Sequence, residues 1–147
     1  MKTTTVHQFS LKLKKCNIEP IKVTCSNDLN NFFKAIYSKL DTYRETVTAV
    51  YLDSENKTIG YEIHSIGGLS GCFIDRRLIL ATAITSGATN IALCHNHPSG
   101  NIRPSESDKD VTAKLLKAAK ILDIRFLDHI IITEQSYFSF ADDGLMI

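Results

Sequence analysis

Apolar and polar side chains alternate near the start of the chain, which is the pattern of a strand with one buried face. Residues 7–15 follow this alternation and predict a half-buried strand, and residues 21–25 predict a second one. A helix capped by Ser26 or Asn27 follows, with apolar side chains at helical spacing as far as Leu40. The apolar face of the first strand consists of Phe9, Leu11 and Leu13.

The middle of the chain predicts a β-hairpin followed by a second helix. Residues 46–52 and 58–66 are rich in β-branched and aromatic side chains, and a polar turn joins them. Residues 67–71 contain three glycines and predict a flexible loop. Asp75 is expected to cap the helix that follows, and Gly87 to end it.

The second half of the chain alternates between strand and helix patterns. Residues 90–94 form an apolar run typical of a buried strand, and residues 105–122 carry the apolar stripe of a long amphipathic helix. Residues 125–133 and 137–140 predict two closing strands. Together these elements predict an α/β fold in which a mixed β-sheet is flanked by helices.

The composition is that of one ordinary globular domain. The chain has 147 residues, of which 44% are hydrophobic and 22% charged. Its 17 Lys and Arg against 16 Asp and Glu give a net charge of +1, so no basic excess supports a nucleic-acid partner. We expect a cytoplasmic protein, because no stretch is apolar enough to span a membrane or to act as a leader. The four cysteines form no C-x-x-C pair and indicate reduced thiols.

The candidate chemistry lies between residues 94 and 110. His95 and His97 stand two apart at the end of the predicted buried strand, so their side chains point to the same face. A loop brings the chain back to Asp108, in the first turn of the following helix. Two imidazoles and one carboxylate suit zinc, and three protein ligands leave a fourth position open for water. Cys94 points to the opposite face and is not expected to be a ligand.

A structural interpretation of the same residues stays open. Ser105 and Asp108 have the spacing of a helix N-cap, so Asp108 can be explained as a capping residue. His95 and His97 can be ordinary histidines at a strand end. Neither explanation alone accounts for both histidines and the acid on one polar loop.

The same residues resemble a known family. His95-x-His97, seven residues, Ser105, two residues and Asp108 resemble the JAMM motif of JAB/MPN-domain metallopeptidases. The longer runs His95–Gly100 and Leu127–Ile132 are similar to the RadC-type branch of that family. The resemblance implies a JAB/MPN domain, a cytidine-deaminase-like sandwich, over residues 43–147. Residues 1–42 are then expected to form a short N-terminal β-β-α extension.

The resemblance also implies roles for individual residues. His95, His97 and Asp108 would hold one zinc ion per chain. Glu62, inside the second strand of the hairpin, would be the general base, although an exposed strand position explains it equally well from sequence. Ser105 would stabilise the oxyanion. The implied reaction is hydrolysis of an amide or isopeptide bond, with a metal-activated water, in an unknown protein or peptide substrate.

Other functions are weighed against this one. The letters His95-Asn96-His97 spell the name of a nuclease class whose defining residues lie far apart, so they are no evidence for it. A zinc nucleobase deaminase needs H-x-E and a later P-C-x-x-C, which are absent. The main alternative is a non-enzymatic RadC-like module associated with DNA or acting as a protein scaffold. His64 is interpreted as a neighbour of Glu62, while Asp128-His129 is either support for a metal ligand or a structural pair.

Overall fold

A five-stranded mixed sheet forms the centre of the computed structural model, which describes residues 5–68 and 71–147. The strands lie in the order β2-β1-β3-β4-β5. β3 and β4 are parallel, and the other three neighbouring pairs are antiparallel. The elements in chain order are α1 (Ser26–Tyr37), β1 (Thr46–Leu52), β2 (Thr58–Ile66), α2 (Arg76–Ser86), β3 (Asn90–Asn96), α3 (Glu106–Ile121), β4 (Arg125–Ile132) and β5 (Tyr137–Ser139).

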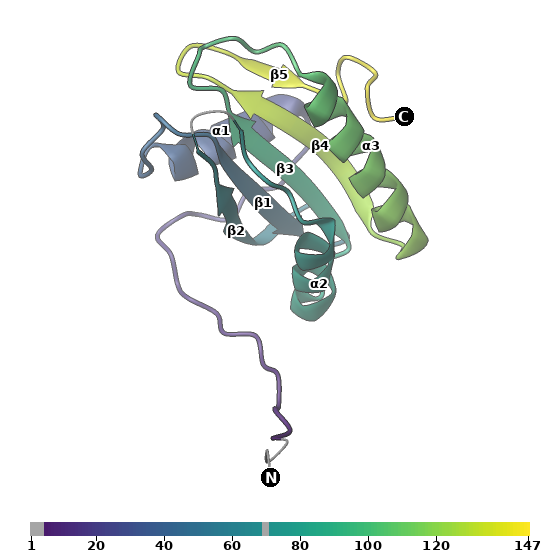
Figure 1. Cartoon of the computed structure of the whole chain (residues 1–147). Coiled ribbons are helices and arrows are strands. Elements are labelled where there is room, and N and C mark those ends of the chain that lie inside the picture. Colours follow the sequence, from purple (N-terminus) through teal and green to yellow (C-terminus); the bar gives the residue numbers. More distant parts are fainter. Residues whose placement is uncertain (1–4, 69–70) are drawn as a thin grey trace.

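The helices cover both faces of the sheet, with α1 behind it and with α2 and α3 in front (Figure 1). Every residue of β1 and β3 is buried, because these two strands have helices on both sides and strands on both edges. The parallel pair β3–β4 requires a crossover connection, and α3 supplies it. The predicted α/β fold with a mixed sheet flanked by helices is therefore confirmed.

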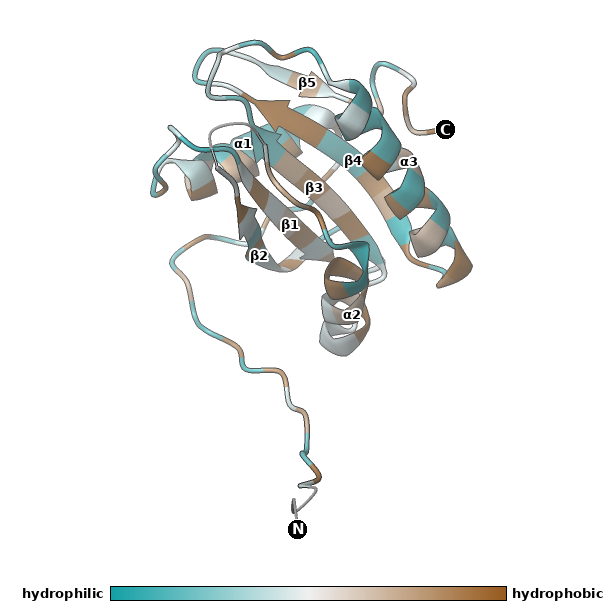
Figure 2. Cartoon of the chain, viewed as in Figure 1, coloured by the Kyte–Doolittle hydropathy of each residue, from teal (hydrophilic) through white to brown (hydrophobic). Residues whose placement is uncertain are grey.

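Two apolar clusters hold the three layers together, one on each face of the sheet. On the front face, Leu93 of β3 and its neighbours pack against α2 and α3. On the back face, Cys94 and its neighbours pack against Phe33 and other side chains of α1. Figure 2 shows the corresponding hydrophobic colouring along the central strands, whereas polar and apolar residues alternate around α3. Within residues 5–68 and 71–147, no helix is both long and apolar enough to cross a membrane.

Helix α1 begins one residue earlier than its predicted caps would place it. Cys25 is the N-cap, and the carboxylate of Asp28 accepts hydrogen bonds from the backbone N–H groups of Thr24 and Cys25. Ser26 was a predicted cap, but its hydroxyl instead donates to Asp142, at 2.6 Å. An acidic residue in the first turn therefore caps the helix, and the nearby serine ties it to the C-terminal segment.

The two strands predicted before α1 differ from the structure. Residues 7–15 do not form a strand: they have no ladder partner, and the side chains of Phe9 and Leu13 are 94% and 87% exposed. Alternation alone does not make a strand, because each backbone group needs a partner across a sheet edge. The second predicted strand is reduced to a single antiparallel bridge between Lys22 and Lys57. Within the predicted loop 67–71, residues 69–70 lie outside the described residues.

Candidate metal centre

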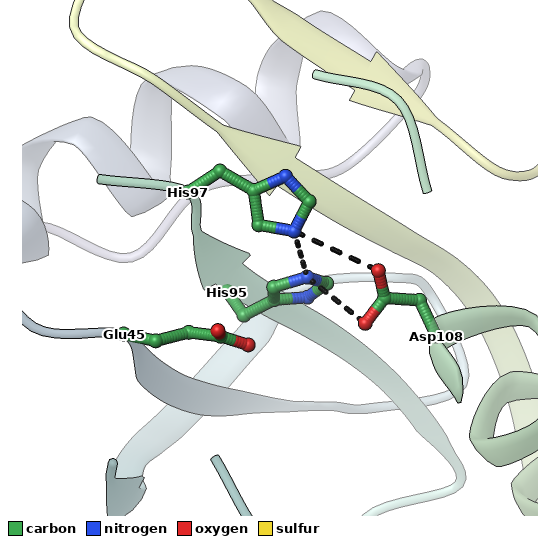
Figure 3. Close-up of side chains that lie close together, drawn as sticks. All are labelled: Glu45, His95, His97 and Asp108. Carbon is green, nitrogen blue, oxygen red and sulfur yellow. Dashed lines mark hydrogen bonds and ion pairs between the residues drawn. The ribbon is translucent and has the colours of Figure 1, made fainter. Parts of the chain in front are cut away.

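Two histidines meet at the end of the central strand β3. His95 is almost fully buried and His97 follows the last residue of the strand, with 16% of its side chain exposed. Their Nε2 atoms lie 2.9 Å apart. The alternation that predicted a shared face is therefore realised, and both rings point to one place (Figure 3).

Asp108 reaches the same place from the first turn of α3. Its Oδ1 lies 3.4 Å from Nε2 of His95, and its Oδ2 lies 3.6 Å from Nε2 of His97. The same carboxylate accepts a hydrogen bond from the backbone N–H of Ser105 at 2.7 Å, while the Ser105 hydroxyl accepts one from the N–H of Asp108 at 3.1 Å. Capping and facing the histidines, which the sequence presents as alternatives, are thus combined in one residue.

Glu45 is a fourth member of this cluster, and sequence reasoning did not identify it. One donor atom from each of Glu45, His95, His97 and Asp108 can be chosen so that all four lie within 4.8 Å of one another. Figure 3 shows the Glu45 carboxylate beside the ring of His95. The pairing of the strands explains its position. β1 pairs antiparallel with β3, and Val47 lies opposite His95. Glu45, two positions before Val47, therefore extends toward His97.

The side chain of Asn96 holds the segment that carries Glu45. Its Nδ2 donates to the carbonyl oxygens of Thr42 and Arg44 at 3.1 and 3.0 Å, and its Oδ1 accepts from the N–H of Thr46 at 2.7 Å. Asn96 is 4% exposed and points away from the face that the two histidines share. The middle residue of His-Asn-His therefore fixes the backbone on both sides of Glu45.

Glu62, the general base that the resemblance implied, lies elsewhere. It sits on β2 opposite Ala49, with β1 between it and β3, and the cluster does not include it. Its carboxylate accepts hydrogen bonds from the hydroxyls of Tyr51 at 2.6 Å and Thr82 at 3.3 Å, so it links the sheet to α2. Burial, together with the hydrogen bond to Glu62, raises the pKa of Tyr51 and keeps its hydroxyl protonated.

His64 is occupied by its neighbours. Its Nε2 accepts a hydrogen bond from the N–H of Asp75 at 2.9 Å, and its Nδ1 lies 3.8 Å from the Glu62 carboxylate. Cys94 lies in the apolar cluster on the α1 face and is not among the clustered donors. These positions agree with the predictions that His64 is a satisfied neighbour and that Cys94 is not a ligand.

The pair Asp128-His129 divides between two roles. Nε2 of His129 lies 2.8 Å from Nδ1 of His95, and burial lowers the pKa of His129 well below its ordinary value, so its ring is neutral at pH 7. Asp128 does not contact the cluster. It accepts hydrogen bonds from the Ser139 hydroxyl at 2.6 Å and from the N–H of Ala141 at 2.9 Å, and so anchors the end of β5.

The electrostatics of the cluster favour a cation. The contact with Asp108 raises the pKa of His97 above its ordinary value, against the opposing effect of burial. Burial acts to raise the pKa of Asp108, but its contacts with His95 and His97 together outweigh burial and leave that pKa lowered. The carboxylate therefore stays ionised and attracts positive charge to the two Nε2 atoms.

The donor set fits a divalent metal. Nδ1 of His97 lies 2.6 Å from the carbonyl oxygen of Asn101, which can only accept, so Nδ1 carries a hydrogen and Nε2 of the neutral ring presents a lone pair. Metal–ligand bonds of about 2.1 Å at tetrahedral angles separate ligand atoms by roughly 3.4 Å. The separations of 2.9, 3.4 and 3.6 Å between the Nε2 atoms and the carboxylate lie on both sides of this value. Imidazole nitrogens and a carboxylate oxygen together are ordinary ligands of first-row divalent ions.

A groove of about 890 Å³ adjoins the cluster beside His97. Its lining includes Lys34 and Tyr37 of α1, and Ile132 with the turn after β4. Of the four clustered residues, His97 lines this groove, whereas Glu45, His95 and Asp108 are not among its lining residues. The residues that follow His97, Pro98 to Gly100, also line the groove.

The fold defines a JAB-type domain, with a cluster of side chains that could hold a metal at the end of its central strand, and comparisons with known proteins agree on the family. A sequence profile of the RadC-like JAB domain matches residues 23–145, and the chain belongs to that family. A UPF0758 protein of Flavobacterium johnsoniae is 41% identical over 135 residues, which cover 92% of this chain and 55% of that protein. A UPF0758 protein of Chlorobaculum tepidum is 33% identical over 146 residues, covering 99% and 65% respectively. The chain thus spans between about half and two thirds of the length of these relatives.

Proposed function

We propose that the chain is a zinc-dependent hydrolase of the JAMM type that cleaves amide or isopeptide bonds. The observation that carries this proposal is the convergence of His95, His97 and Asp108 on one point, with the carboxylate of Glu45 beside them. Two imidazoles and one carboxylate are the ligand set of many catalytic zinc sites, which keep a fourth position for water. The proposed ion is one zinc per chain, held by His95, His97 and Asp108.

Glu45 takes the role of general base in this proposal, in place of Glu62. When bound, zinc would lower the pKa of water toward neutrality and polarise a carbonyl group. The Glu45 carboxylate lies near enough to the ligand atoms to accept a proton from an attacking water and to return it to the leaving amine. Glu62 is engaged with Tyr51 and Thr82 on another strand.

Ser105 can act on the oxyanion without leaving its capping position. Its oxygen accepts the hydrogen bond from the N–H of Asp108, which uses a lone pair and not the hydroxyl hydrogen. That hydrogen stays available for donation to an oxyanion formed beside Asp108. The cap and the catalytic role therefore use different parts of one hydroxyl group.

The proposed substrate is a protein or peptide with an accessible amide or isopeptide bond. The groove beside His97 is lined by both polar and apolar residues, among them Lys34, Glu134 and Ile132. Such a groove can accept an extended chain, whose backbone needs hydrogen-bonding partners along its length.

The test compares Glu45→Gln with Glu62→Gln, the two candidates for the general base. It also includes His97→Ala, which removes a proposed zinc ligand. Zinc binding is measured by titration calorimetry, and hydrolysis on a panel of peptide and isopeptide-linked substrates. The parent should bind about one zinc and His97→Ala should bind little. Glu45→Gln should keep zinc binding and lose hydrolysis by about 10²–10⁴-fold, because the amide cannot accept the proton, whereas Glu62→Gln should remain active.

Other results would point to other functions. Loss of zinc in Glu45→Gln would make Glu45 a ligand, and loss of activity only in Glu62→Gln would return the role of base to Glu62. Equal zinc binding by the parent and by His97→Ala would contradict the proposed zinc site. Zinc binding with no turnover on any substrate, together with salt-dependent DNA binding, would favour the non-enzymatic module.

A further inference from the structure

A chain of three hydrogen bonds runs behind His95, inside the protein. Nδ1 of His95 lies 2.8 Å from Nε2 of His129. Nδ1 of His129 lies 2.7 Å from the hydroxyl oxygen of Thr112, and that hydroxyl donates to the backbone carbonyl of Asp108 at 2.6 Å. The three side chains are at most 1% exposed, so water does not compete for these bonds.

The last member of the chain fixes the direction of every bond in it. A carbonyl oxygen can only accept, so the single hydrogen of the Thr112 hydroxyl is committed to Asp108. The Thr112 oxygen must then accept from Nδ1 of His129, which therefore carries the hydrogen of that neutral ring. Nε2 of His129 is left as an acceptor, and Nδ1 of His95 must donate to it.

The consequence appears on the other side of the His95 ring. A neutral imidazole with its hydrogen on Nδ1 has a lone pair on Nε2. Nε2 of His95 is the atom that faces Nε2 of His97 and the Asp108 carboxylate. The buried chain thus begins at one proposed ligand and ends on the backbone of another, and it links β3, β4 and α3.

We propose that Thr112 and His129 are positioning residues, which hold His95 in the tautomer and ring orientation that binds zinc. The inference rests on the proposed zinc site and adds residues that the JAMM spacing does not contain. The ring of His129 is itself held by stacking on Phe140, with ring centroids 4.7 Å apart and planes 13° apart. Partners that orient ligating histidines typically account for 10–100-fold in metal affinity.

Thr112→Val and Thr112→Ser form a matched pair of test variants. Valine keeps the shape of threonine but removes the hydroxyl, so Nδ1 of His129 loses its acceptor. The His129 ring then favours the tautomer with hydrogen on Nε2, which drives the hydrogen of His95 onto the atom that should bind metal. Serine keeps the hydroxyl and both of its bonds.

Two measurements read out the effect without a substrate. Zinc affinity is measured by competition with a chromophoric chelator, and histidine tautomers in the metal-free protein by long-range ¹H–¹⁵N NMR. We expect the parent and Thr112→Ser to carry the His95 hydrogen on Nδ1 and to bind zinc alike. Thr112→Val should bind zinc 10–100-fold more weakly and show hydrogen on Nε2 of His95.

Each failure has a distinct meaning. Parent-like zinc affinity or an unchanged His95 tautomer in Thr112→Val would overturn the positioning role and leave the zinc site standing. A parent that does not bind zinc would overturn the proposed function, and the tautomer measurement would still decide whether the chain of bonds orients His95. If Thr112→Val does not fold, the tautomer measurement on the parent tests the inference by itself. Hydrogen on Nε2 of His95 in the parent would contradict it.

Discussion

At the scale of single residues, the protonation of His97 should govern when the site can take up metal. The contact with Asp108 raises the pKa of His97 above 6.5, and a metal ligand must be the neutral imidazole. Zinc therefore competes with a proton once the pH falls through this raised pKa. We expect zinc affinity to be nearly constant above that pKa and to fall about tenfold per pH unit below it, for each proton displaced.

Titration calorimetry in buffers of different ionisation enthalpy measures this effect directly, because it counts the protons released per zinc. The stability of the metal-free protein depends on pH in the opposite direction. A histidine whose pKa is raised on folding stabilises the folded state at a pH below its unfolded-state pKa, and this stabilisation is lost as the pH rises through its folded-state pKa. Zinc should thus stabilise the protein most at a pH above the folded-state pKa of His97, where the metal-free protein has lost this contribution. Zinc affinity that does not change between pH 5 and 8 would contradict the assignment of His97 as a ligand.

The residues of the site that sequence could predict are those whose placement is local. His95 lies on β3 and His97 directly follows its last residue, and Asp108 lies in the helix turn that a short loop brings back, so spacing alone placed them together. Glu45 lies 50 residues before His95 in the chain, and its position depends on how β1 pairs with β3. The contact of His129 with His95 likewise depends on the parallel pairing of β3 and β4.

At the scale of elements, the loop before β1 depends on one side chain from β3. Asn96 makes three hydrogen bonds to the backbone of residues 42–46, and alanine would leave all three groups without these partners. We expect Asn96→Ala to lower the free energy of unfolding by about 2–3 kcal/mol, since each buried group left unpaired costs about 1–3 kcal/mol and some will find water.

Urea denaturation of the metal-free protein measures this change, with Asn31→Ala as the control. Asn31 lies on the exposed side of α1, so its replacement should change stability by no more than about 0.5 kcal/mol. Equal stability of Asn96→Ala and the parent would mean that the loop carrying Glu45 is held by other contacts, such as the hydrogen bond from Tyr37 to the carbonyl of Thr46.

Most elements followed from the sequence because local patterning and tertiary packing agree in them. The hairpin strands β1 and β2 were predicted with their observed bounds, and α3 was predicted within a residue at either end. Residues 7–15 have an equally regular pattern but form no strand. A strand is completed by a neighbouring edge, and the sequence of the segment itself does not say whether such an edge is offered.

At the scale of the whole molecule, α1 is part of the same apolar core as the sheet. The face of the sheet formed by Val50, Ala92 and Ile130 is covered by side chains of α1, among them Phe33. The division of the chain at residue 42 stays a prediction, and it places α1 in the extension. If α1 is part of the core, its removal should have a different effect on folding than if α1 belongs to a separate extension. The buried apolar side chains of α1 are Leu29, Phe32, Phe33, Ile36 and Tyr37.

Two truncations should therefore behave in opposite ways. Burying one large apolar side chain contributes about 1.5–3 kcal/mol, so the five from α1 contribute roughly 8–15 kcal/mol, which is comparable to the whole net stability of a domain. A chain that begins at residue 43 should not fold cooperatively. A chain that begins at residue 16 should unfold like the parent, because residues 5–15 are all exposed and belong to neither apolar cluster. Circular dichroism during urea unfolding measures both, and a cooperative, parent-like transition of residues 43–147 would instead make α1 a dispensable extension.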